Sequence, residues 1–260
     1  MEAESTLKRA LHTEALIFCR KKSTWIVTLF LLLLTVYAVC IAKSELGYQI
    51  EMGNHKVLEQ STFPPIWNGI LFFTAMFGGT IYILFGLFDS ISEGRMGCTM
   101  QRVTNTEIKD LILGRTLVVA IQGIMNFMVV SVIGIFAQIF LWKGQESFWS
   151  LEVIAVGIGK LVTIVVLLVS SYIAGSIIGQ YAKNTAIGVI LCLFFDQAVL
   201  ANSYLYKGFL YRAFEESIFL VVPATNTCFP FEWFVIIPLL VLNIVIFLFL
   251  YMVLYKRKFK

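Results

Sequence analysis

Long apolar blocks constrain this chain more than any other feature of its sequence. A transmembrane helix needs about 20 mostly apolar residues to cross a bilayer, and blocks near that length recur along the chain. Only 14% of the residues are charged, whereas a soluble globular domain carries about a quarter. The sequence therefore predicts an all-α polytopic membrane protein, with one transmembrane domain over residues 1–260. We place its six spans at 25–42, 66–88, 111–142, 151–178, 186–201 and 232–255.

The segment before the first span, residues 1–24, has the pattern of an amphipathic helix. Leu7, Leu11, Ala15 and Phe18 fall on one helical side, which is the spacing of an apolar helix face. Basic residues, Arg9 and Arg20 among them, flank that face. The pattern predicts a basic helix that lies in the membrane interface.

A second amphipathic segment lies between the fifth and sixth spans, at residues 202–231. Tyr206, Leu210, Phe214 and Ile218 share one helical face there, and Pro223 ends the pattern. We predict a short helical hairpin in the outer interface. An ordinary aromatic anchor in an otherwise irregular loop is the alternative.

The distribution of Lys and Arg predicts which side each loop occupies. If the N-terminus is cytoplasmic, fourteen of the twenty basic residues lie on the cytoplasmic side and five on the outside, with Lys160 inside a span. Cytoplasmic loops of membrane proteins carry the excess of Lys and Arg. Both termini are therefore predicted to be cytoplasmic.

The sequence offers no catalytic, metal or nucleotide site. His12 and His55 are predicted to lie on opposite sides of the membrane, and no two of the five cysteines have the spacing of metal ligands. The stretch from Gly157 to Leu161 contains a Gly-Lys pair. It lacks the first glycine of a phosphate-binding loop, and Leu161 replaces the required Ser or Thr.

Two charged residues fall inside predicted spans, where charges usually have a functional role. Lys160 in the fourth span and Asp196 in the fifth lie at similar depths below the outer face. We expect them to form an ion pair, although each could instead face a polar neighbour of its own. Ser171, Gly175 and Gly179 form a stripe of small residues, which lets another helix approach closely.

The polar segment at 89–110, between the second and third spans, holds the sharpest motif. The candidate contact residues in it are Asp89, Glu93, Gly94, Arg95, Arg102 and Glu107. With six spans and a basic N-terminal helix, this pattern resembles the permease subunits of ATP-binding-cassette (ABC) transporters of the type-2 exporter class. A solvated cytoplasmic loop with no partner is the plainer interpretation of the same residues.

The resemblance implies a specific assembly. In that family the segment after the second span is a coupling helix that docks on a separate ATPase subunit, and the interfacial helix, here with Arg9 and Arg20, packs beside it. Two ATPases and a second permease, identical or related, complete the transporter. ATP and Mg²⁺ would bind to the ATPases, so this chain would hold no cofactor, and it would contact lipid rather than nucleic acid.

The expected function is ATP-driven export across the plasma membrane of a bacterium. The aromatic-rich apolar interior favours an amphipathic or hydrophobic cargo, such as a bacteriocin-like peptide or a drug, and hence a role in resistance. The alternative is a non-transporting membrane scaffold or immunity protein that binds a toxin or another partner directly.

Overall fold

The computed structural model describes residues 2–54, 58–59, 63–95, 108–142, 150–182, 184–195, 244–245 and 248–254. The regular elements of these residues are all α-helices. They are α1 (Glu2–Arg20), α2 (Lys22–Glu51), α4 (Pro65–Arg95), α6 (Ile108–Leu141), α7 (Leu151–Tyr181) and α8 (Thr185–Phe195). Residues 248–254 are also helical. The outer segment at 202–231 lies outside the described residues.

Four helices are long and apolar enough to cross a membrane: Lys22–Glu51, Pro65–Ser92, Lys109–Leu141 and Val153–Tyr181. They correspond to the first four predicted spans and indicate a multi-pass membrane protein. The first ten residues of the fifth predicted span, 186–195, belong to α8. With 11 residues, α8 is too short to cross a bilayer, and residues 196–201 lie outside the description. The sixth predicted span is described only at 244–245 and 248–254.

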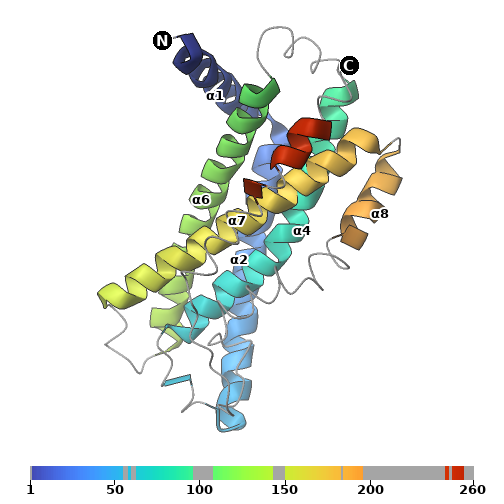
Figure 1. Cartoon of the computed structure of the whole chain (residues 1–260). Coiled ribbons are helices and arrows are strands. Elements are labelled where there is room, and N and C mark those ends of the chain that lie inside the picture. The colour runs from blue at the N-terminus through green and yellow to red at the C-terminus, as the bar shows by residue number, and fades with distance from the viewer. Residues whose placement is uncertain are drawn as a thin grey trace.

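The four long helices alternate in direction along the bundle (Figure 1). Helices α2 and α6 run away from the end of the bundle that carries α1, and α4 and α7 run back toward it. We call these two ends the α1 end and the far end. Residues 248–254 contact the α1-end half of α7, because Tyr181 Oη donates a hydrogen bond to the carbonyl of Leu254 at 3.3 Å.

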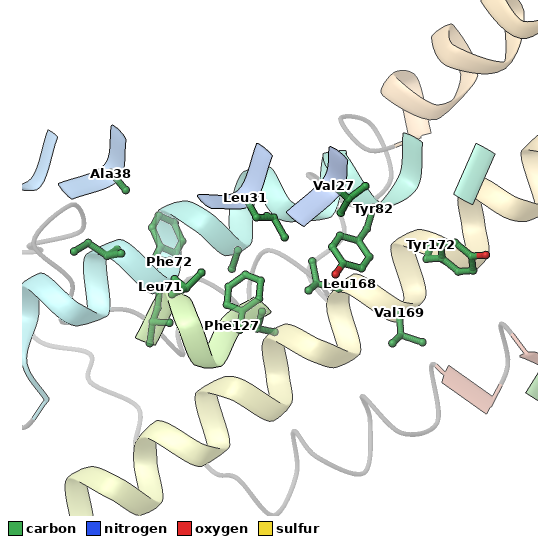
Figure 2. Close-up of a cluster of buried hydrophobic side chains, with 14 of the residues drawn as sticks. Val27, Leu31, Ala38, Leu71, Phe72, Tyr82, Phe127, Leu168, Val169 and Tyr172 are labelled. Atoms are coloured by element: carbon green, nitrogen blue, oxygen red, sulfur yellow. The ribbon is translucent and has the colours of Figure 1, made fainter. Parts of the chain in front are cut away.

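Helix α4 lies at the centre and is the most buried of the four long helices. Its Gly78 leaves room for side chains from three neighbours. A Cβ atom at Gly78 would lie 3.3 to 3.7 Å from side-chain atoms of Leu168, Leu31 and Phe127. Figure 2 shows these three side chains, which come from α7, α2 and α6, converging in the core. The core is therefore built around α4.

Helices α4 and α7 run parallel and pack backbone against backbone. A Cβ atom at Gly175 would lie 1.8 Å from the carbonyl oxygen of Ile83, and one at Gly179 would lie 2.7 Å from that of Leu87. Gly86 of α4 faces the carbonyl oxygen of Tyr172 in the same way, at 2.1 Å. The stripe of small residues predicted in the fourth span thus packs against a helix of the same chain.

We expect Gly175→Ala to destabilise the protein by about 3 kcal/mol, because the added methyl group would overlap a backbone carbonyl that cannot rotate away. Gly47→Ala in α2 is the matched control, since no atom lies within 4 Å of a Cβ there. The control should be neutral or stabilising by up to about 1 kcal/mol, because Ala favours helix over Gly. Denaturation of the detergent-solubilised variants measures both. Equal stabilities would contradict the close contact between α4 and α7.

Candidate functional site

Four charged residues are buried at the α1 end of the bundle. The exposed fractions are 2% for Asp89, 3% for Arg115, 4% for Glu14 and 7% for Asp110. Buried charges are costly unless they are paired and hydrogen-bonded. Their gathering where several helices meet makes this end the candidate functional site.

Asp89, on α4, joins two other segments through its two carboxylate oxygens. Lys21 Nζ, at the break between α1 and α2, forms an ion pair with Oδ1. Tyr172 Oη, on α7, donates a hydrogen bond to Oδ2 at 2.6 Å. Both partners donate to the ionised carboxylate, and hydrogen bonds to a charged group are the stronger kind. Asp89 therefore ties α4 to α7 and to the start of α2.

A second ion pair attaches α1 to α6. Arg115 Nε lies 3.5 Å from Glu14 Oε2, and both side chains are at most 5% exposed. The backbones lie close to each other at Gly114, the preceding residue, since a Cβ there would be in van der Waals contact with the carbonyl carbon of Ala10, at 3.4 Å. The amphipathic helix α1 therefore buries a face that includes an acidic residue as well as apolar ones.

The two ion pairs lie at the same end of the bundle. Lys21, which binds Asp89, directly follows α1, which carries Glu14. The network, which we call the anchor network, consists of Glu14, Lys21, Asp89, Arg115 and Tyr172. It joins α1, α2, α4, α6 and α7 at one end of the bundle.

A kink at Lys21 allows this arrangement. Lys21 has an extended backbone, with φ −71° and ψ 126°, which separates α1 from α2. Thr24 Oγ1 donates a hydrogen bond to the Phe18 carbonyl at 2.7 Å and so satisfies an acceptor at the end of α1. The break directs α1 across the start of α6 and brings the Lys21 ammonium to Asp89.

The candidate contact residues of the 89–110 segment fall into three groups. Asp89 is buried and bonded within the chain. Glu93, Gly94 and Arg95 form the last helical turn of α4, and their side chains lie outside the description. Arg102 and Glu107 lie wholly outside it. Of the basic residues predicted to lie nearby, Arg9 belongs to α1 and Arg20 is exposed at its end.

The anchor network includes residues that the sequence patterns did not single out. Arg115 lies close to the start of the third predicted span, and its charge was interpreted as cytoplasmic. Glu14 lies on the buried side of α1 beside Leu11 and Ala15, where only apolar side chains were expected. Tyr172 carried no signal of its own, since a tyrosine in an apolar helix is ordinary.

At the far end, Lys160 has a polar neighbour on another helix. Its Nζ donates a hydrogen bond to Oδ1 of Asn68, on α4, at 2.7 Å and lies 4.3 Å from the centre of the Phe63 ring. This is the arrangement that the sequence left open beside pairing with Asp196. Asp196 itself lies outside the described residues.

Asp89→Asn should destabilise the protein by about 3 kcal/mol, because it leaves the Lys21 ammonium without its counter-charge in a partly buried site. The double variant Lys21→Met with Asp89→Asn should recover part of that loss. Tyr172→Phe, which removes one hydrogen bond, should cost about 1 kcal/mol. Denaturation of these purified variants, and of the single variant Lys21→Met, measures the effects. Strict additivity of the Lys21 and Asp89 effects would contradict the ion pair.

Comparisons with known proteins do not assign the site to a known type, since no protein-family model, no curated protein and no solved structure matches the chain.

Proposed function

We propose that this protein is the membrane-spanning permease subunit of an ATP-driven exporter of the ABC type. The anchor network is the observation that carries the proposal. A permease that is driven from outside must transmit force from a water-facing segment to its membrane helices. The segment at 96–107 follows α4 and precedes α6, and both helices enter the anchor network within a few turns of it.

The network supports transmission because its ion pairs cross helix boundaries. A push that displaces the end of α4 acts on Asp89, and through it on Lys21 and Tyr172. A push on the start of α6 acts on Arg115 and through it on α1. Since these contacts are buried and charge-assisted, they resist being pulled apart. A displacement at the segment therefore spreads through α4 and α6 to α1, α2 and α7.

The chemistry of the segment suits a docking element. It carries acidic and basic side chains together, Glu93, Arg95, Arg102 and Glu107, and such mixed charge can form complementary pairs with a partner. Basic residues are concentrated in the loops on this side, which favours a cytoplasmic position. ATP would bind to the partner ATPase, and two permeases would enclose the path of an amphipathic or hydrophobic cargo.

The test is to co-express the protein with a Walker-A-bearing ATPase encoded beside it and to purify the complex into lipid nanodiscs. We expect co-purification and ATPase activity that an amphipathic peptide stimulates. Arg102→Ala should lower the amount of retained ATPase about tenfold, the effect of losing about 1.4 kcal/mol of contact. Lys43→Ala, an exposed lysine on α2, is the control and should change nothing.

A second variant separates docking from transmission. Asp89→Asn should keep the ATPase bound, since Asp89 is buried, but should reduce the stimulation by peptide. If no ATPase is retained and Arg102→Ala changes nothing, the exporter proposal fails. Binding of a toxin peptide by the permease chain alone, with protection of cells that lack the ATPase, would instead identify a scaffold or immunity protein.

A further inference from the structure

Helix α1 lies at the edge of the bundle, beside the start of α6 (Figure 1). Its inner face packs on other helices: Ala10 and Phe18 are each 5% exposed, and the Phe18 ring centre lies 5.5 Å from that of Phe85, on α4. An amphipathic helix at a membrane usually buries its apolar face between the lipids. Here protein covers much of that face, so contact between α1 and the membrane falls to the residues that remain exposed.

The exposed charges between residues 8 and 30 are all positive among the side chains that the structure describes. Lys8, Arg20 and Lys22 are exposed. The only acidic residue in this stretch is Glu14, and its carboxylate is buried in the ion pair with α6. Helix α1 and the start of α2 therefore present a basic surface.

The other helices add no exposed acidic side chain to this end in the described part of the chain. Asp89, on α4, and Asp110, on α6, are both buried. The opposite end of α2 differs, because Lys43 and Glu51 are both exposed there and leave the charge mixed. An excess of exposed positive charge is thus a property of the α1 end.

The exposed apolar surface of α2 begins next to these cations. Trp25 is 65% exposed, and its Nε1 donates a hydrogen bond to the carbonyl of Cys19, on α1, at 2.9 Å. Leu29 and Leu33, one and two turns further along α2, are exposed as well. Tryptophan is enriched where the acyl chains of a bilayer meet the headgroups. The position of Trp25 therefore places the exposed part of α1 at the level of the headgroups.

We propose that the exposed part of α1 and the start of α2 bind the headgroups of anionic phospholipids. Arg20 and Lys22 supply the counter-charges nearest to Trp25, and Lys8 supplies one further along α1. Basic segments beside a transmembrane helix are attracted to anionic lipids. The bilayer is the occupant that fits both properties of this surface, since its acyl chains cover the apolar side of α2 and its headgroups lie where that side ends. The proposal is independent of any ATPase partner.

Trp25 can report on the lipid at this surface, because bromine on an acyl chain quenches a tryptophan that it contacts. The purified protein is reconstituted into phosphatidylcholine bilayers that contain a fixed fraction of brominated phosphatidylglycerol or, in the matched sample, brominated phosphatidylcholine. Subtracting the emission of the Trp25→Phe variant isolates the signal of Trp25. We expect phosphatidylglycerol to bind beside Trp25 about fivefold more tightly than phosphatidylcholine. High salt should reduce this preference, since the interacting charges are exposed.

Three variants assign the preference to these cations. The double variant Arg20→Gln with Lys22→Gln should reduce it to below about twofold. Lys8→Gln should have a smaller effect, because residue 8 lies about 17 Å from Cys19 along the helix, at 1.5 Å per residue. The matched control is Lys43→Gln, an exposed lysine toward the other end of α2, which should keep the full preference.

The proposal is overturned if the two brominated lipids bind equally beside Trp25, and the cations would then be left to another occupant, such as an acidic protein surface. It is also overturned if the double variant, shown by its melting temperature to be folded, keeps the full preference. A preference that Lys43→Gln removes would equally count against it, because the anionic lipid would then bind elsewhere.

Discussion

The close approach of α4 and α7 is the contact on which the rest of the structure depends. Gly86, Gly175 and Gly179 bring the two backbones together, and in lipid such packing replaces the hydrophobic force that joins helices in water. The fixed register then determines both polar clusters. The bond from Tyr172 to Asp89 and the bond from Lys160 to Asn68 cross this same interface. A shift of one residue between the helices would break both.

The two ends of the bundle are joined by different kinds of polar contact. At the α1 end, acidic and basic side chains are matched, as Asp89 with Lys21 and Glu14 with Arg115. At the far end, the Lys160 ammonium donates to the neutral side-chain oxygen of Asn68 and lies over the Phe63 ring. Both kinds of contact link α4 to its neighbours, but only the ion pairs at the α1 end place opposite charges on different helices.

The sequence predicted the apolar helices well, because length and hydropathy are local properties. The first four spans and the small-residue stripe at Ser171, Gly175 and Gly179 have counterparts in the structure. Pairing was harder to predict, since it depends on the register between distant helices. Lys160 was identified as an intramembrane charge, but Asn68 was not identified as its partner. Glu14 was missed because the buried face of α1 was assigned from its apolar residues alone. A charged residue can lie on such a face when it forms a buried ion pair, as Glu14 does with Arg115.

The bonds from Gln138 to the start of α4 have a mechanical consequence. One side chain on α6 accepts from two successive backbone N–H groups, and all of these groups are buried, so α4 cannot slide along its axis there without losing both bonds. A tilt about its far end, made together with α7, is the displacement of α4 that keeps both bonds. For a helix of 31 residues, a tilt of about 5° moves the other end by about 4 Å, at 1.5 Å of rise per residue. That end carries Asp89.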